Sequence, residues 1–427
     1  MSLLPKNAST MIGSLIKEGA FIVFAANAVN KFALFISNIL IVNFMTKDDY
    51  GIFSYANNLF AFALLITGFC LLPGLLQFCS EKRPEEEKES IQKYVLLRGT
   101  AIDSLLAFLL LVIGLFIALP IDDAGYCVAL LAPILILDFA HQFVIVVLRT
   151  KKQNRTFALL QNINSISYAT FSCLGAYLGG IIGLVLGRYF AYFLSLIFDI
   201  VFCRRYLKFF IHVKRLADKL KKELWRYVLL NGAASVINQI IYIADIFLIG
   251  LLLREASLVA TYRVATALPE GLLLVSGSAL LFAVPYFAAN NQNGAWQKKY
   301  SNLMLLALAA VNGIAAILLF IFAPQLIELL WGSSYLDAVV ILRILAVSYF
   351  FDGSLRVPSA NLLACLRKVE FNLTISIVFG ILHIVSLVIF VNLFGIIGAA
   401  FNTMFVILLK GSISTMYLRR TVNRMIS

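Results

Sequence analysis

Twelve long apolar segments run through the chain, and they constrain its fold more than any other feature. A helix needs about 20 apolar residues to cross a bilayer, where backbone groups can pair only within the helix itself. The pattern therefore predicts an all-α polytopic membrane protein with twelve transmembrane helices. The expected spans are 18–44, 52–79, 94–119, 126–148, 156–178, 181–203, 228–250, 257–289, 301–323, 336–366, 369–391 and 394–418.

The composition agrees with a membrane protein and gives no sign of an enzyme. Hydrophobic residues make up 61% of the 427 residues and charged residues only 13%, roughly half the charged share of a soluble protein. The sequence has no Walker A loop, no HExxH or GxSxG motif, and no Cys/His spacing typical of a metal site. We therefore expect no enzymatic activity, no cofactor and no metal, and we interpret the six cysteines as small core residues.

The loops between these segments alternate sharply in charge. One set, which includes both termini, is basic, whereas the other holds only Lys47 and Arg254. By the positive-inside rule, the basic loops and both termini are predicted to be cytoplasmic, which accounts for much of the net charge of +13. The basic set comprises Lys82, Arg83, Lys88 and Lys93; Arg149, Lys151, Lys152 and Arg155; the segment 204–227; Lys298 and Lys299; Arg367 and Lys368; and Arg419, Arg420 and Arg424.

A weak internal repeat divides the chain into two halves. Aligning TKDDYGIFSYANNL with LREASLVATYRVATAL sets Lys47 on Arg254, Asp48 on Glu255 and Tyr55 on Tyr262. Six spans separate the two stretches, so the halves would be parallel repeats in one orientation. We predict a six-helix lobe over 1–203, a basic cytoplasmic link over 204–227 and a second six-helix lobe over 228–427.

The link is basic, with aromatic residues interleaved among its charges. We expect an amphipathic helix at the membrane interface beside anionic lipid. The alternative is a docking site for a partner enzyme, and nucleic-acid binding is not expected beside a membrane span.

Polar residues recur at helical spacing inside several spans, which favours an aqueous cavity over isolated interhelical hydrogen bonds. Cations at membrane depth would make such a cavity attractive to a phosphate or pyrophosphate group. The predicted substrate-binding residues are Lys31, Arg188, Arg263, Arg343 and Arg356, with Asn27 and Asn38 in the first span and Asn231 and Asn238 in the seventh.

Structural roles compete with binding at several of these positions. Arg356 is four residues from Asp352 on one helix face, a spacing that favours an ion pair. Arg263 and Glu270 lie on one helix face but two turns apart, too far for a direct bond. Arg343 is near enough to the outer surface to act at the cavity mouth or to snorkel, and Lys410 is near enough to the cytoplasmic surface to snorkel.

Three titratable residues are candidates for ion coupling. Asp138 and His141 are one turn apart in the fourth span, where they can form a packed hydrogen-bonded pair or a proton or cation site. Glu270 in the eighth span is the third candidate.

Three stretches make the chain resemble the polysaccharide-transporter branch of the multidrug/oligosaccharidyl-lipid/polysaccharide superfamily, the Wzx-type O-antigen and capsule repeat-unit flippases. These stretches are FMTKDDYGIFSYANNL (44–59), LREASLVATYRVATAL (253–268) and FAPQLIELLWGSSYLDAVVILRILAV (322–347). The resemblance implies two six-helix lobes around a central cavity that opens alternately to each side of a bacterial cytoplasmic (inner) membrane. It also implies a flippase that moves an undecaprenyl-pyrophosphate-linked oligosaccharide repeat unit to the outer leaflet.

The resemblance further suggests site residues and partners. Related flippases hold the pyrophosphate with basic residues of the first and eighth spans, which here are Lys31 and Arg263. A polysaccharide polymerase and glycosyltransferases are expected partners, and we expect a monomer. The alternative function is an ion-coupled multidrug antiporter of the same fold. A polymerase or glycosyltransferase is disfavoured because no loop is large enough to form a catalytic domain.

Overall fold

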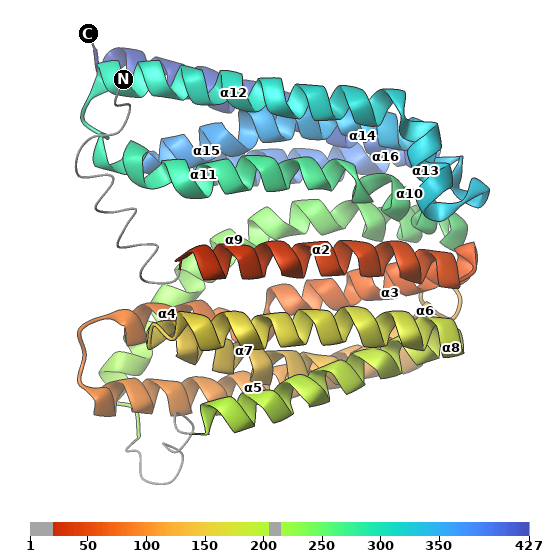
Figure 1. The fold of residues 1–427 in the computed structure, drawn as a ribbon, viewed down its shortest axis with the longest axis horizontal. Coiled ribbons are helices and arrows are strands. Elements are labelled where there is room, and N and C mark those ends of the chain that lie inside the picture. The colour runs from red at the N-terminus through yellow and green to blue at the C-terminus, as the bar shows by residue number, and fades with distance from the viewer. Residues whose placement is uncertain (1–19, 205–214, 427) are drawn as a thin grey trace. The chain divides into compact units, whose positions relative to one another are not determined.

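The computed structural model describes residues 20–204 and 215–426 (Figure 1). Within these ranges every regular element is helical and none is a strand. The chain divides into two compact units, Met1–Val236 and Ile237–Ser427. Each unit is described by itself below.

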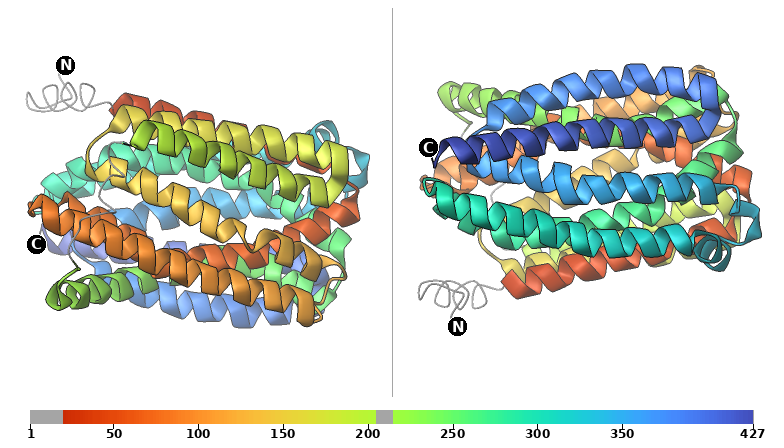
Figure 2. Two further views of the ribbon diagram at one scale, coloured as in Figure 1. Left: turned by 90° about the horizontal axis from the view of Figure 1, so that it is seen from below. Right: turned by 90° about the horizontal axis from the view of Figure 1, so that it is seen from above.

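The helices of the first unit lie roughly parallel or antiparallel to one another, as the views of Figure 2 show. Thr46 begins the second of them: its hydroxyl accepts a hydrogen bond from the backbone N–H of Asp49 at 3.1 Å, satisfying a donor that a helix start leaves free. The short acidic turn TKDD is thus a helix cap. The elements are α2 (Ala20–Phe44), α3 (Lys47–Leu65), η1 (Thr67–Cys70), α4 (Leu71–Ser80), α5 (Glu85–Phe116), α6 (Ala124–Leu131), α7 (Ile134–Thr150) and α8 (Asn154–Cys203).

The second span of this unit is broken in its middle by a left-handed turn. Gly68, Phe69 and Cys70 all have positive φ, of 53°, 49° and 60°. The backbone N–H of Gly68, which the break releases from helical pairing, donates to Asp103 Oδ1 at 2.7 Å. Asp103 therefore satisfies a backbone group that hydrocarbon would leave unpaired.

The second unit repeats this pattern with further interruptions. Its second span is broken by the turn η3, and its fourth by the π-helical turn η5, which contains Gly353 and is followed by Pro358. The elements are α10 (Ala256–Ala267), η3 (Pro269–Gly271), α11 (Leu272–Ala289), α12 (Gly294–Ile321), α13 (Ala323–Trp331), η4 (Ser333–Tyr335), α14 (Ala338–Phe351), η5 (Asp352–Arg356), α15 (Val357–Cys365) and α16 (Val369–Arg424).

The long helices α8 and α16 each fold back on themselves at a glycine. Gly180 and Gly395 are the turning points. A Cβ on Gly183 would lie 2.1 Å from the carbonyl oxygen of Gly175, and one on Gly398 would lie 2.0 Å from that of Phe390. The two arms of each hairpin therefore touch backbone to backbone, a contact that only glycine permits.

The described residues contain the predicted twelve spans. Eight helical segments are long and apolar enough to cross a membrane, and two of these are the doubled helices α8 and α16. Shorter apolar stretches, Val29–Phe44 in α2 and Ile243–Leu253 in α9, supply the first and seventh spans. The prediction of an all-α protein with twelve transmembrane helices is confirmed.

The second half of the link between the predicted lobes does not lie at the membrane interface as we expected. Helix α9 begins at Asp218 and continues without a break to Leu253. Leu220 and Leu224 are buried in the core of the first unit, and the indole N–H of Trp225 donates to the hydroxyl of Tyr94 at 2.9 Å. The apolar face of this segment thus packs on protein and not on lipid, because α4, α5 and α7 offer it an apolar surface. Residues 205–214 of the link lie outside the described residues.

Candidate functional site

Arg188 is the most enclosed of the predicted cations. It lies in the second arm of α8 with only 6% of its surface exposed. Its Nη1 donates to Asn57 Oδ1 at 2.7 Å, and its guanidinium lies 4.7 Å from the ring centre of Phe53 and 5.0 Å from that of Tyr168. Among the described residues no carboxylate forms an ion pair with it. The charge is thus held by an amide and two aromatic rings, a favourable but incomplete substitute for a counter-ion.

Two tyrosines connect Arg188 to a predicted ion-coupling residue. The ring of Tyr168 packs edge-on against that of Tyr192, with centroids 6.2 Å apart, and the hydroxyl of Tyr192 donates to Asp138 Oδ1 at 2.9 Å. The first unit therefore brings a predicted binding cation and a predicted coupling acid into one buried polar cluster.

His141 belongs to the same cluster but pairs with a residue of another helix. Its Nδ1 lies 2.8 Å from Asp199 Oδ2, and both side chains are buried. The hydrogen bond of His141 therefore goes to Asp199 and not to Asp138, which is one turn away in sequence. His141 Nε2, Asp199 Oδ1 and Asp103 Oδ2 are buried without a hydrogen-bond partner among the described residues, so the cluster retains capacity to bind a proton or a cation.

Lys31, predicted from the first span, lies in α2 and is exposed. It makes no hydrogen bond or ion pair to the described residues. On the same helix Asn38 accepts a hydrogen bond from the hydroxyl of Tyr50 at 3.2 Å. The side chains of Asn27, Asn231 and Asn238 lie outside the described part of the structure.

Arg263 and Glu270 correct our expectation that they are too far apart to bond. Arg263 Nη1 lies 3.5 Å from Glu270 Oε1, with the side chains 34% and 43% exposed. The turn η3 interrupts the helix at Pro269, so the spacing of a straight helix does not apply between them. The bond is long, and both side chains are partly exposed.

The other two predicted cations have local partners. Arg356 forms the expected ion pair with Asp352 across the turn η5. Arg343 Nε donates to the carbonyl oxygen of Phe320 at 3.0 Å, and its guanidinium lies over the Phe320 ring. Since Phe320 is in the last turn of α12, Arg343 satisfies a carbonyl that the helix end leaves free and opposes the helix dipole.

Sequence reasoning missed a buried network in the second unit. Asp245 accepts hydrogen bonds at 2.8 Å from the hydroxyls of Tyr262 and Thr403, and its other oxygen lies 2.8 Å from His383 Nε2. Asn402 Nδ2 lies 3.2 Å from His383 Nδ1. A neutral imidazole that accepts at Nδ1 and donates from Nε2 satisfies every one of these contacts. The sequence shows Asp245 as an acid inside the seventh span, but the signal for its partner, a single histidine inside the apolar run 369–391, was not used.

Lys410 also differs from our expectation. It is buried, and its Nζ lies 3.2 Å from the hydroxyl of Ser376 in the other arm of α16. It therefore turns into the unit and does not snorkel, because the neighbouring arm supplies a hydrogen-bond partner at that depth.

Taken one unit at a time, the structure shows multispan helical bundles with charged and polar side chains held inside them. Intramembrane charge of this kind marks substrate or ion pathways, and broken helices at membrane depth are a feature of transporters. The structure therefore defines a multispan helical membrane protein with the broken helices and buried charges that are typical of transporters.

The comparisons with known proteins agree with this class. The family described as "Polysaccharide biosynthesis protein" matches residues 16–291, and the chain belongs to this family. No curated protein matches the chain.

Solved structures show that the fold is that of the MOP superfamily. The lipid II flippase MurJ in an inward closed conformation superimposes with a TM-score of 0.76 at 15% identity, over 94% of this chain and 87% of that one. An inward-facing multidrug resistance MATE transporter of the MOP superfamily superimposes with a TM-score of 0.76 at 12% identity, over 95% of this chain and 98% of that one. A eukaryotic MATE transporter superimposes with a TM-score of 0.65 at 15% identity, over 96% of this chain and 98% of that one.

Proposed function

We propose that this transporter is a flippase for an undecaprenyl-pyrophosphate-linked oligosaccharide. It would carry the head group from the cytoplasmic to the outer leaflet of the bacterial inner membrane by alternating access. Membership of a polysaccharide biosynthesis family supports this substrate class, as does a fold shared with a protein named as a lipid II flippase.

The accessibility of Lys31 is the observation that carries the proposal. A charged side chain that is exposed in the middle of a membrane helix is costly in hydrocarbon, so it is expected to face water or a ligand. Arg263 is the second accessible cation, since its bond to Glu270 is long and both side chains are partly exposed. A pyrophosphate has oxygens for charge-assisted hydrogen bonds to both cations.

Substitution of the two cations tests the proposal. We expect Lys31→Ala and Arg263→Ala each to abolish surface polysaccharide in cells that depend on this gene, with the protein still present in the membrane. Lys299→Ala removes the same charge from an exposed residue in the first turns of α12 and serves as the matched control. Normal polysaccharide from both test variants would refute the cationic site.

A proton- or sodium-coupled multidrug antiporter is the second candidate. The buried cluster of Asp138, His141 and Asp199, with its unpaired atoms, is the observation that favours ion coupling. Increased drug susceptibility of a deletion strain, with normal surface polysaccharide, would support the antiporter over the flippase. The flippase predicts the opposite pair of results.

A further inference from the structure

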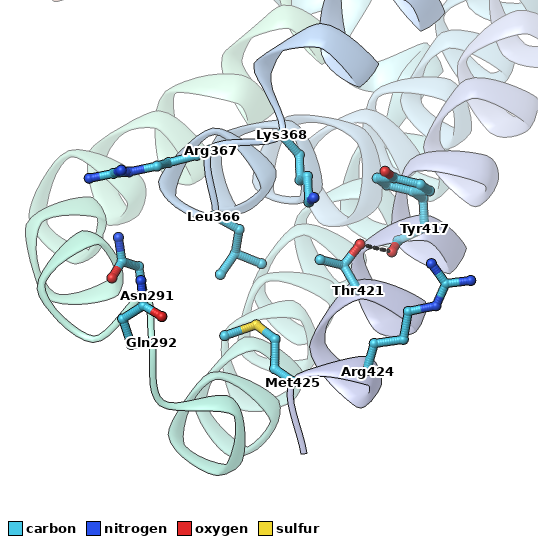
Figure 3. A pocket seen from close by; sticks show the side chains of 9 residues that line it. All are labelled: Asn291, Gln292, Leu366, Arg367, Lys368, Tyr417, Thr421, Arg424 and Met425. Carbon is cyan, nitrogen blue, oxygen red and sulfur yellow. Dashed lines mark hydrogen bonds between the residues drawn. The ribbon is translucent and has the colours of Figure 1, made fainter. Parts of the chain in front are cut away.

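A pocket of about 300 Å³ opens at one end of the second unit, where three chain segments meet (Figure 3). The segments are the turn after α11, the turn between α15 and α16, and the end of α16. All three belong to the side that the charge pattern predicts to be cytoplasmic. The lining residues are Asn291, Gln292, Leu366, Arg367, Lys368, Tyr417, Thr421, Arg424 and Met425.

The lining carries three cations and no carboxylate. Arg367 and Lys368 form no ion pair with any residue in the described ranges. Arg83 in the first unit, by contrast, lies within 3.7 Å of carboxylate oxygens of Glu81, Glu87 and Glu223. The positive-inside rule explains why basic residues occur on this side, but it does not explain why three of them line one hollow whose lining residues include no acid.

The backbone that presents Arg367 and Lys368 is fixed by a helix-ending motif. The backbone N–H of Lys368 donates to Leu363 O at 2.9 Å and that of Arg367 to Ala364 O at 3.0 Å, with Arg367 at φ 59°. These are the two hydrogen bonds of a Schellman motif. Lys152 has the same motif in the first unit, with φ 56° and matching bonds at the end of α7.

The opposite wall of the pocket is also held in place. The ring of Tyr417 stacks on that of Phe371 with centroids 3.8 Å apart and planes 7° from parallel. Thr421 donates to the carbonyl oxygen of Tyr417 at 2.8 Å, as the dashed line in Figure 3 shows. Beyond it the chain end packs so closely on α12 that a Cβ on Gly294 would lie 2.8 Å from Met425 O.

The cationic side chains lie on two different sides of the pocket. In Figure 3 Lys368 and Arg424 lie on the Tyr417 side of the pocket, whereas Arg367 extends to the Asn291 side. An ammonium and a guanidinium on one wall provide donors to several oxygens of one tetrahedral anion. The amides of Asn291 and Gln292 are available to the rest of a ligand, and a volume of this size is at the lower end for small-molecule sites.

We propose that this pocket binds a phosphate-bearing anion, held by Lys368 and Arg424 at the membrane surface. The phosphate can belong to the head group of an anionic lipid or to a soluble phosphate compound. A lipid phosphate would reach the pocket from the surrounding bilayer, whose cytoplasmic leaflet concentrates anionic head groups near basic side chains. The site is independent of the cations proposed for transport.

Thermal unfolding of the full-length protein in neutral detergent tests the proposal with two probes. One is phosphatidylglycerol in mixed micelles, compared with phosphatidylcholine, and the other is inorganic phosphate, compared with chloride at equal ionic strength. A ligand that binds the folded state raises Tm, and near saturation we expect a rise of about 2 °C or more. A rise with phosphatidylglycerol alone identifies a lipid head group, and a rise with inorganic phosphate identifies a soluble ligand.

Two matched double variants locate the effect. Lys368→Gln with Arg424→Gln removes two charges from the pocket, and Lys152→Gln with Arg420→Gln removes two charges from outside it. We expect the first to lose the Tm rise and the second to keep it. If the pocket variant fails to fold, Lys368→Gln alone is expected to reduce the rise. An equal rise in both double variants, or no rise with either probe in the unaltered protein, would overturn the proposal.

Discussion

Gly180 and Gly395 have nearly the same backbone conformation at equivalent points of the two units. Their angles are φ 55°, ψ −135° and φ 59°, ψ −143°. The same separation of 215 positions (395 − 180 and 367 − 152) relates Arg367 to Lys152, which share a Schellman motif. Repeated backbone features at one offset give the internal repeat firmer support than three matched residues in the sequence.

This conformation predicts that both turning points require glycine. The region near φ 60°, ψ −140° is almost closed to residues with a Cβ and costs about 1–3 kcal/mol. Gly180→Ala and Gly395→Ala should each lower Tm in detergent, although a Cβ at either position would meet no atom within 4 Å. Gly179→Ala is the matched control. A Cβ at position 179 would also meet no atom within 4 Å, but Gly179 has a negative φ. Equal losses at positions 179 and 180 would contradict a conformational cause.

Much of the fold was accessible from the sequence because hydropathy and charge act over whole segments. Twenty apolar residues must form a helix in a bilayer, and loop charge sets its direction, so spans and repeat could be read directly. Local breaks were harder to see. No local sequence pattern predicts the left-handed turn at Phe69 and Cys70. The backbone N–H that this turn releases, that of Gly68, is satisfied by the carboxylate of Asp103, 35 positions away.

A second prediction concerns Gly99, which faces the ring of Phe139. A Cβ on Gly99 would lie 2.0 Å from Phe139 Cζ, and a Cβ on Gly68 would lie 2.4 Å from Cε2 of the same ring. Gly→Ala inside a helix is ordinarily favourable by about 0.5–1 kcal/mol, but overpacking costs about 1–3 kcal/mol. We expect the clash to dominate and Gly99→Ala to lower Tm.

Two further variants isolate the clash at Gly99. Phe139→Leu should recover part of the loss in the double variant, because it shortens the clashing group. Gly277→Ala in α11, where a Cβ meets nothing within 4 Å, should not lower Tm. Additive effects of Gly99→Ala and Phe139→Leu would show that the ring is not the obstacle.

A third prediction follows from the network around Asp245. Three donors converge on this carboxylate, from Tyr262, Thr403 and His383. Asp245→Asn keeps the shape but replaces an acceptor by a donor, so at least one buried group loses its partner at a cost of about 1–3 kcal/mol. Thr403→Val removes one donor only and should cost less, about 0.6 kcal/mol in a membrane protein. Thermal unfolding in detergent checks this order, and a larger loss for Thr403→Val would be inconsistent with it.

The candidate site was only partly predictable for a related reason. Charged residues in apolar runs are visible in a sequence, and Arg188 and Asp138 were found in this way. Their partners come from other helices: Asn57 for Arg188, Tyr192 for Asp138 and Asp199 for His141. Pairing depends on how helices pack side by side, which single-helix periodicity does not determine.

The last prediction separates function from stability at Arg188. A buried cation without a carboxylate partner pays a desolvation cost, so replacing it with an apolar side chain of similar length is often neutral or stabilising. Arg188→Met should therefore leave Tm unchanged or raise it, yet abolish surface polysaccharide if the charge serves transport. Arg188→Lys keeps the charge but not the planar contact with Phe53 and Tyr168, and should give intermediate polysaccharide. The measurements are Tm in detergent and surface polysaccharide at matched membrane levels of each variant. A large fall in Tm for Arg188→Met would assign the residue a structural role, and normal polysaccharide from that variant would remove it from the transport site.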